Sequence, residues 1–260
     1  MYYDGINAII NGCLMRYKVV VSYNGAKYCG WQTQHRGDSV QEAIETILSA
    51  MHREAIEIVA SGRTDAKVHA MGQVFHFDSN LNMSCKAVKT ALNSQIPKDI
   101  RIIDVEIVED DFHARFHAIS KRYDYYLTNE MENPFVDDFM AKYYGQLNLE
   151  DMKECAKIFL GEHDFTSFTS AKIDPRKSRV KTITRFDVVE EGNIVHFILE
   201  GNGFLRYMVR MLVQTVIEVG KGKITTLDAK KMLEGKDKHL CRFKAPAQGL
   251  YLVKVDYEGR

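Results

Sequence analysis

Residues 60–77 read Ala-Ser-Gly-Arg-Thr-Asp-Ala-Lys-Val-His-Ala-Met-Gly-Gln-Val-Phe-His-Phe, and they are the centre of the predicted fold. Ile56, Ile58 and Ala60 alternate with Glu57, Val59 and Ser61 as the stretch begins, and it ends with Val74, Phe75 and Phe77, whose side chains favour strands. Two such runs around a polar segment predict two strands joined by a charged loop, residues 62–70.

The loop holds one carboxylate, Asp65, with Arg63 and Lys67 two residues to either side. In extended chain this spacing sends all three side chains to one side. Two nearby cations favour the ionised acid, which suits a nucleophile or an electrostatic stabiliser of positive charge better than a general acid. The alternative is an Asp that closes the loop by bonding to its own backbone.

The composition is that of a folded protein with room for two lobes, with 260 residues of which 45% are hydrophobic and 27% charged. No apolar run reaches the length of a membrane span and no leader pattern begins the chain, so we expect a cytoplasmic protein. The five cysteines are dispersed without a Cys-x-x-Cys pair. They indicate neither a disulfide framework nor a zinc site.

The net charge of zero argues mildly against a nucleic-acid binder, but the charges are segregated. Residues 104–111 hold five acids, whereas residues 172–185 hold six lysines and arginines and a single acid, Asp174. Such segregation gives one face that attracts phosphate, or else two solvated surface loops.

The first half predicts the order strand, helix, strand, strand, helix, strand. The strands at its two ends are 15–23 and 100–108; one helix follows the capping box of Ser39 and Glu42, and a second covers 84–95. This is the order of a ferredoxin-like unit. The folded unit is expected to start near Met15, with residues 1–14 as a loose extension.

The second half repeats strand, helix, strand, strand, which predicts a duplicated architecture. The expected segments are strands at 119–127, 181–190, 193–200 and 249–255, and helices at 149–160, 203–219 and 226–233. We therefore predict an α+β fold of two ferredoxin-like lobes, 15–112 and 113–260. The lobes would form a central antiparallel sheet with helices on one face.

The helix predicted at 203–219 is apolar almost all round, except that Arg206, Arg210 and Gln214 recur at steps of four. A buried guanidinium without a partner is costly, so Arg206 or Arg210 should face a carboxylate or a phosphate. The alternative is that the arginines reach the surface.

Ordered motifs over residues 15–257 make the chain resemble the tRNA pseudouridine synthase A (TruA) family. Each is weak by itself, and their order and spacing carry the resemblance: Tyr23-Asn24-Gly25 with Gly30-Trp31-Gln32, Gly62-Arg63-Thr64-Asp65 with Val68-His69-Ala70, Phe112-His113-Ala114-Arg115-Phe116 with Lys121-Arg122-Tyr123, Phe165-Thr166-Ser167-Phe168, Gly203-Phe204-Leu205-Arg206 with Met208-Val209-Arg210, and Ala245-Pro246 with Gly249-Leu250-Tyr251-Leu252.

The resemblance implies that Asp65 is the catalytic aspartate, that Arg210 pairs with it, and that Tyr123 stacks on the flipped uracil. It also implies an RNA-binding cleft between the two lobes, where Arg63 holds RNA and Leu250 lines the base pocket. The substrate would be uridine in the anticodon arm of tRNA, at about positions 38–40. The enzyme would be a homodimer whose two basic clefts share one tRNA, with no metal or organic cofactor.

Two positions depart from the family pattern, because Lys67 and Gln214 stand where the family has glycine. Glycine at the first suggests a positive φ or a close approach to RNA, and lysine would adopt a positive φ only with strain. Another role for Lys67 is a phosphate contact, and Arg206 is also expected to bind the substrate.

The implied chemistry fits a lone carboxylate. Uridine isomerisation breaks the bond from C1′ to N1, turns the uracil and joins C1′ to C5, so an acid must attack or stabilise an electron-poor C1′. An adduct at C1′, addition to the ring, and removal of a ribose proton all remain open. One rival is a non-catalytic RNA-binding protein with the same fold. Another is a metallohydrolase built from His69, His76, Asp78, His113 and His117, whose spacing matches no metal motif.

Overall fold

The computed structural model describes residues 14–33, 38–131, 133–170 and 178–258. The expected extension, 1–14, therefore lies outside the described residues except for Leu14, and the first strand begins at Met15. Within the described ranges, no helix has the length and apolar character needed to cross a membrane.

The first half forms the predicted ferredoxin-like unit. Its elements are β1 (Met15–Tyr23), α1 (Val40–His52), β2 (Val59–Ala60), β3 (His69–Ser79), α2 (Cys85–Gln95) and β4 (Ile100–Val108). The Ser39 side chain accepts a hydrogen bond from the amide of Glu42 and starts α1 as its capping pattern predicted. The strands lie in the order β4-β1-β3, with β2 on the far side of β3.

The second half repeats this arrangement with different lengths. Its elements are β5 (Ala118–Thr128), β6 (Ala141–Lys142), α3 (Leu149–Lys157), β7 (Gly161–Asp164), β8 (Val180–Glu191), β9 (Ile194–Gly201), α4 (Met208–Gly220), α5 (Thr226–Gly235) and β10 (Leu250–Tyr257). The order β10-β5-β9-β8 matches β4-β1-β3-β2 strand for strand. The duplicated architecture is thus confirmed, and the last strand of the chain completes the second unit.

The two units join through β3 and β10 to make one sheet. This contact is parallel and short, with Tyr251 opposite His69 and Leu252 opposite Ala70. The pairing of β5 with β6 is parallel too. The sheet is therefore mixed, whereas an antiparallel sheet was expected, because the second unit adds its fourth strand alongside the third strand of the first.

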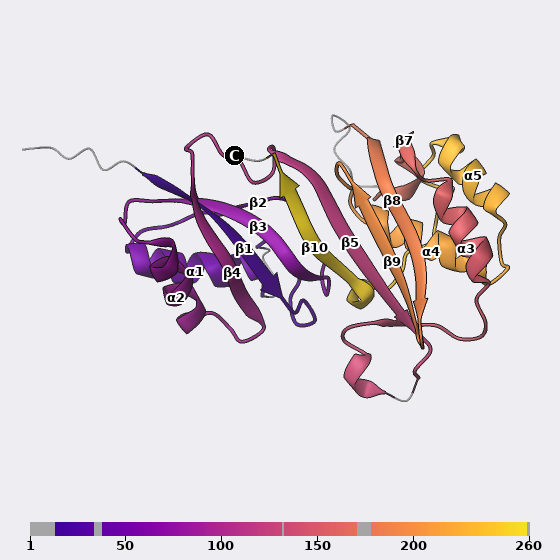
Figure 1. Ribbon diagram of the computed structural model, residues 1–260, viewed down its shortest axis with the longest axis horizontal. Helices are drawn as coiled ribbons and strands as arrows, with labels where there is room; N and C mark the ends of the chain where they lie inside the picture. The colour runs from indigo at the N-terminus through magenta and orange to yellow at the C-terminus, as the bar shows by residue number, and fades with distance from the viewer. Residues whose placement is uncertain (1–13, 34–37, 132, 171–177, 259–260) are drawn as a thin grey trace, which may run out of the picture.

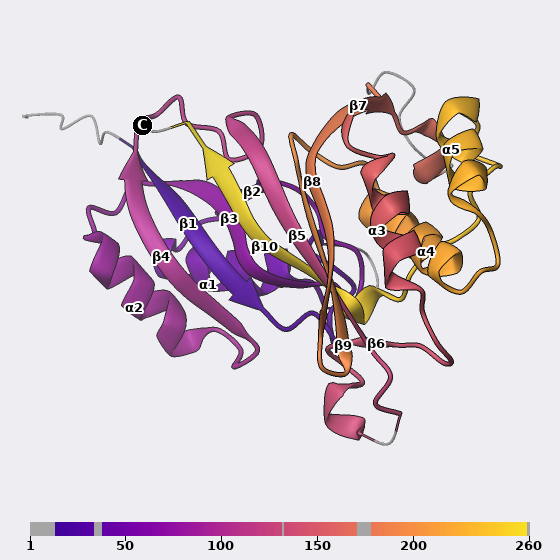
Figure 2. The ribbon, with the colours of Figure 1, turned by 45° about the vertical axis from the view of Figure 1, so that its right-hand side comes forward.

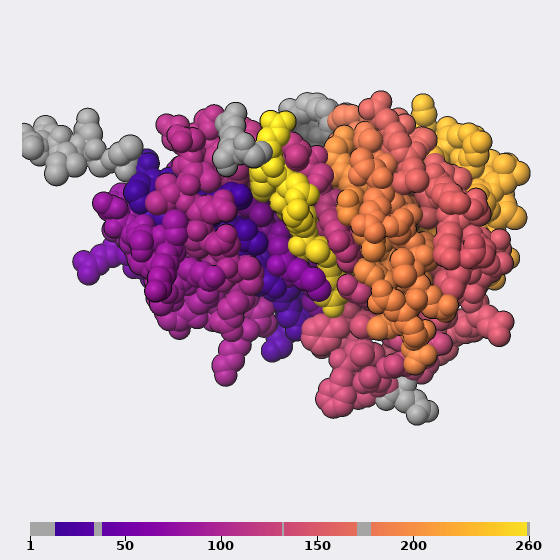
Figure 3. Space-filling model, in the orientation of Figure 1, coloured from indigo at the N-terminus to yellow at the C-terminus, as the bar shows by residue number. Residues whose placement is uncertain are grey.

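The helices gather in two groups, α1 and α2 beside the N-terminal half of the sheet and α3, α4 and α5 beside the C-terminal half (Figures 1 and 2). The view of Figure 1 looks onto the strands, and Figure 3 shows β10 and β8 at the surface of that face. Apolar side chains of the strands, such as Tyr17, Phe75, Tyr125 and Phe197, are fully buried. They form the core on which the loops of the site rest.

The helix predicted at 203–219 begins five residues later, at Met208. The backbone of Tyr207 has φ 68°, a left-handed conformation that a helix interior cannot contain. Arg206 therefore precedes the helix and is exposed, and Gln214 donates a hydrogen bond to Glu218 of the same helix. The predicted polar stripe of three residues is wrong. Of its two arginines, Arg210 is the one that forms an ion pair with a carboxylate, that of Asp65.

Candidate active site

Asp65 lies on the loop between β2 and β3, opposite the first turn of α4. Arg210 of that helix donates from Nη1 to Oδ2 of Asp65 over 3.2 Å, and the two side chains are only 11% and 21% exposed. Nε of Arg210 donates to the carbonyl of Ala245 at 2.8 Å, while the Ala245 amide donates to the carbonyl of Arg210. Contacts with the backbone of Ala245 thus hold the guanidinium in the orientation in which it binds Asp65.

Burial and charge act on Asp65 in opposite directions. Burial raises the pKa of the Asp65 carboxyl, and the positive charges of Arg210, Arg206 and Lys244 lower it, the net direction being upward. The cations that act most strongly on the acid therefore come from α4, from the residues just before it, and from the segment between α5 and β10. The sequence neighbours Arg63 and Lys67, which the spacing indicated, are both exposed.

The loop that carries Asp65 is held by the connection between β1 and α1. The hydroxyls of Tyr23 and Thr64 are 2.8 Å apart and hydrogen-bonded. The Trp31 amide donates to the carbonyl of Thr64, and the Lys67 amide donates to the carbonyl of Tyr28. Segments some forty residues apart in sequence are joined by these contacts.

Two glycines of that connection make room for the loop. A Cβ on Gly25 would lie 2.0 Å from the carbonyl oxygen of Val68, and one on Gly30 would lie 2.6 Å from that of Thr64. Gly30 also has φ 106°, which favours glycine. Sequence reasoning noted these residues only as parts of motifs, whereas their role is the close approach of two backbones.

Lys67 has φ 64°, so the position does take the left-handed conformation that glycine in the family pattern suggested. A lysine there bears backbone strain of about 1–2 kcal/mol. Its side chain is exposed.

Tyr123 of β5 lies near Asp65, and the start of β10 pairs with this part of β5. Tyr123 pairs with Leu252 across the strands and is only 9% exposed. Burial raises the pKa of the Tyr123 hydroxyl, and the negative charge of Asp65 raises it further, which puts the phenol near the acid. The ring of Phe204 meets that of Tyr123 edge to face at 5.2 Å, and Leu250 is buried opposite Tyr125.

Tyr207 is a residue of the site that the sequence did not indicate. Its ring has Arg206 at 4.8 Å, Arg210 at 5.7 Å and Lys244 at 4.6 Å. These are the same cations that act on Asp65, and an aromatic face holds them together by cation–π attraction. The positive φ of Tyr207 at the helix start was the feature that no periodicity reveals.

A family model described as tRNA pseudouridine synthase matches residues 19–117 and 155–258. The chain belongs to the tRNA pseudouridine synthase family. The chain is 43% identical to the tRNA pseudouridine synthase A of Exiguobacterium sp. strain AT1b, over 94% of this chain and 99% of that protein. It is 40% identical to that of Bacillus subtilis strain 168, over 94% of this chain and all of the relative.

Among solved structures, a Cbf5-Nop10-Gar1 complex aligns with a TM-score of 0.43 at 12% identity, over 92% of this chain and 50% of that chain. A likeness this weak adds nothing to the assignment. The synthase family rests on the sequence matches.

The histidines of the metallohydrolase alternative have structural contacts in this family member. Nδ1 of His69 accepts from the Gly25 amide, and Nδ1 of His76 accepts from the Ala114 amide. Burial, with the charges of Arg16 and His113, lowers the pKa of His76 to about 4. Among the described residues, no cluster of histidine, cysteine and carboxylate side chains could hold a metal ion.

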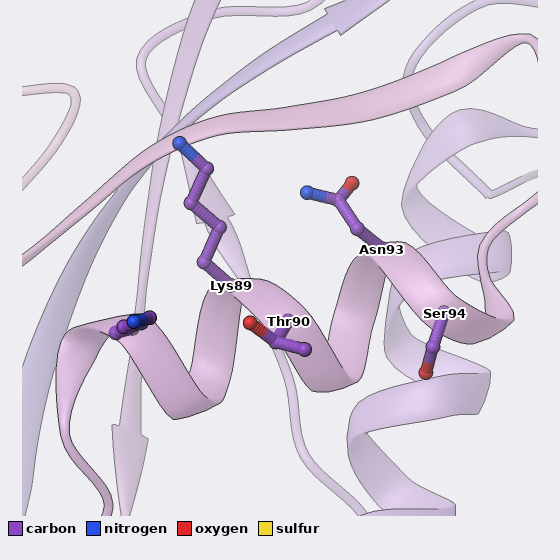
Figure 4. Close-up of a pocket in the computed structure, with 5 residues that line it drawn as sticks. Lys89, Thr90, Asn93 and Ser94 are labelled. Carbon is purple, nitrogen blue, oxygen red and sulfur yellow. The ribbon is translucent and has the colours of Figure 1, made fainter.

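A surface hollow on α2 is separate from the synthase site. Lys86, Lys89, Thr90, Asn93 and Ser94 line it, and Figure 4 shows Lys89 and Asn93 pointing away from Ser94. Lys89 and Asn93 donate to backbone carbonyls of β4. These contacts fasten the helix to the sheet and assign no chemistry to the hollow. Of the basic stretch predicted at 172–185, residues 172–177 lie outside the described residues.

Proposed function

We propose that this chain isomerises uridine to pseudouridine in the anticodon arm of tRNA, at about positions 38–40, with Asp65 as its catalytic carboxylate. The observation that carries the proposal is the buried ion pair of Asp65 and Arg210, 3.2 Å apart and beside Tyr123, in a member of the synthase family.

The reaction needs a group that acts on C1′ of the target ribose. Breaking the bond from C1′ to N1 leaves the sugar carbon electron-poor, and an ionised carboxylate attacks or stabilises such a carbon. Arg210 opposes the effect of burial on the pKa of the Asp65 carboxyl and fixes the orientation of that carboxyl. Asp65 and Arg210 are thus proposed to act as one unit.

Tyr123 and Leu250 are proposed to hold the flipped uracil. Extracting a base from its stack costs a few kcal/mol, and stacking on an aromatic ring returns about 1–3 kcal/mol. Tyr123 is 9% exposed and is braced by Phe204, so only a base seated against Asp65 would reach it. The uracil would then be in position for its own rotation.

Exposed cations around the site are proposed to hold the RNA backbone. Arg63 and Lys67 lie on the same loop as Asp65, and Arg206 and Lys244 lie across from it at the ring of Tyr207. These four cations outnumber a single carboxylate, that of Asp65, and such an excess of positive charge favours phosphate binding. A non-catalytic RNA binder would gain nothing from a carboxylate among them, which disfavours that alternative.

We also propose that the protein acts in the cytoplasm as a homodimer. Phe135 and Tyr144, on the segment between β5 and α3, are 86% and 77% exposed and are open to contact with a second copy. The family resemblance supports the same arrangement. A monomeric mass in sedimentation of the purified protein would contradict it.

Tritium release from tRNA labelled at uridine C5 tests the reaction and its carboxylate together. We expect release by the wild type and a loss of roughly 10³-fold or more in Asp65→Asn, with tRNA binding retained. Asp104→Asn, an exposed acid of β4, is the matched control and should keep the wild-type rate. Release by Asp65→Asn near the wild-type rate would sink the proposal.

A further inference from the structure

Lys121 lies on β5, two residues before Tyr123, and its side chain reaches the start of the catalytic loop. Nζ donates to the carbonyl of Ser61 at 2.7 Å. It also lies 2.9 Å from the point where a Cβ on Gly62 would be, so the ammonium is packed against the first residues of Gly62-Arg63-Thr64-Asp65. The contact joins β5, which carries Tyr123 as the proposed stacking platform for the uracil, to the loop that carries Asp65.

Among the described residues, the charged groups that act most on this ammonium are both cations. They are Arg115, from the loop before β5, and Lys181, from β8. The cross-strand neighbours of Lys121, Gly201 on β9 and Val255 on β10, carry no charge. The loop presents only the neutral carbonyl of Ser61.

A partly buried ammonium in such surroundings is unfavourable in the free protein. Burial, with the charges of Arg115 and Lys181, lowers the pKa of Lys121 to about 8. An apolar residue of similar size would give the folded protein higher stability, because a buried charge without an opposite charge is destabilising. An anion arriving at these side chains would remove the penalty.

Such an anion would come close to the base platform. The side chain of Lys181 passes Gly203, with its Cδ 3.9 Å from where a Cβ on that glycine would be. The next residue, Phe204, braces the ring of Tyr123. The anion that suits this place is a phosphate of the RNA strand that carries the target base.

We propose that Arg115, Lys121 and Lys181 bind one backbone phosphate of the substrate RNA, and that Lys121 transmits this contact to Asp65 through the carbonyl of Ser61. Lys121 is then a positioning residue, and the catalytic loop takes its working position when the phosphate is bound. The inference rests on the proposed function for its ligand, but its test measures binding and needs no turnover.

The test follows binding of an anticodon stem-loop RNA by fluorescence anisotropy from about pH 7 to pH 9.5. The ammonium is present below its pKa and is lost as the pH rises through it, so wild-type affinity should be full near pH 7 and fall above about pH 8. Lys121→Arg keeps its charge throughout and should not show the fall. Lys121→Met should bind roughly tenfold more weakly near pH 7 and be flat with pH.

Lys18→Met is the matched control, a partly buried strand lysine that pairs with Glu106 instead. It should keep the wild-type profile. The melting temperature of Lys121→Met should be equal to or above that of the wild type, which a merely structural lysine would not allow. Salt titration should show a slope lower by about one phosphate contact for Lys121→Met.

An alkaline fall in Lys121→Arg that matches the wild type would overturn the inference, whether or not Lys121→Met folds. So would equal affinity of Lys121→Met and the wild type near pH 7. Failure of the wild type to release tritium from labelled tRNA would instead defeat the proposed function. The binding profiles would still test the phosphate contact, because they do not depend on turnover.

Discussion

At the scale of single residues, the site depends on the balance around Asp65. Burial raises the pKa of its carboxyl, and Arg210 is the strongest of the cations that oppose this effect. The acid must be ionised to act on C1′, and it is ionised above its pKa. We therefore expect Arg210 to serve the proposed catalysis through both orientation and charge.

Arg210→Gln should move the acid limb of kcat/KM to higher pH, because burial would then raise the pKa of Asp65 with less opposition. The rate near neutral pH should fall roughly 10- to 100-fold, the scale of one lost charged hydrogen bond. Tritium release measured across pH checks both effects. Arg185→Gln, which removes an arginine paired with Asp187 and Glu200, should leave the profile unchanged. An unshifted acid limb in Arg210→Gln would show that the arginine does not control this pKa.

At the scale of elements, the catalytic loop is a shared structure of two connections. The residues between β1 and α1 supply the hydroxyl, amides and carbonyl that hold the loop between β2 and β3. Their glycines let the two backbones touch. The loop around Asp65 therefore has little freedom of its own.

Gly25→Ala should disturb this support directly, since the new Cβ would lie 2.0 Å from the carbonyl oxygen of Val68. Backbone cannot yield as a flexible side chain does, so we expect a destabilisation of about 1–3 kcal/mol and a lower kcat. Thermal melting and tritium release measure the two effects. Lys27→Ala, at an exposed position of the same connection, is the control. A Gly25→Ala protein with normal melting and normal turnover would show that the contact is dispensable.

At the scale of the whole molecule, the last strand joins the two ferredoxin-like units. β10 pairs with β5 along most of its length and meets β3 in a short parallel contact. It also starts with Leu250, beside the proposed base pocket. Lobes of 15–112 and 113–260 remain our proposal for the division of the chain.

Ending the chain after Gly249 should therefore prevent cooperative folding. Without β10, β3 and β5 would present unpaired edges in the middle of the sheet, and the apolar face of Leu252 and Val255 would be missing from the core. We expect aggregation, or no cooperative thermal transition by circular dichroism. A chain ending after Glu258, just beyond β10, should melt as the full chain does. A cooperative transition in the shorter chain would refute the central role of β10.

Periodicity in the sequence determined most of the elements and their order. The strand at 15–23, the N-cap at Ser39 and the helix at 84–95 are local patterns, and the structure has each of them. Together with the repeated order they were sufficient for a duplicated fold, because each element buries one apolar face wherever it packs. Motif order likewise indicated the synthase family.

Only the tertiary structure decided which charges meet. Arg63 and Lys67 are near Asp65 in sequence, but Arg210, Arg206 and Lys244 act on it, because α4, the residues before it and the segment between α5 and β10 fold against the loop of Asp65. Tyr207 delays the start of the predicted helix to Met208 through its φ, which depends on packing rather than on periodicity. Lys121 faces two cations and a carbonyl for the same reason. Charges act through space, and the distances between them exist only once the chain has folded.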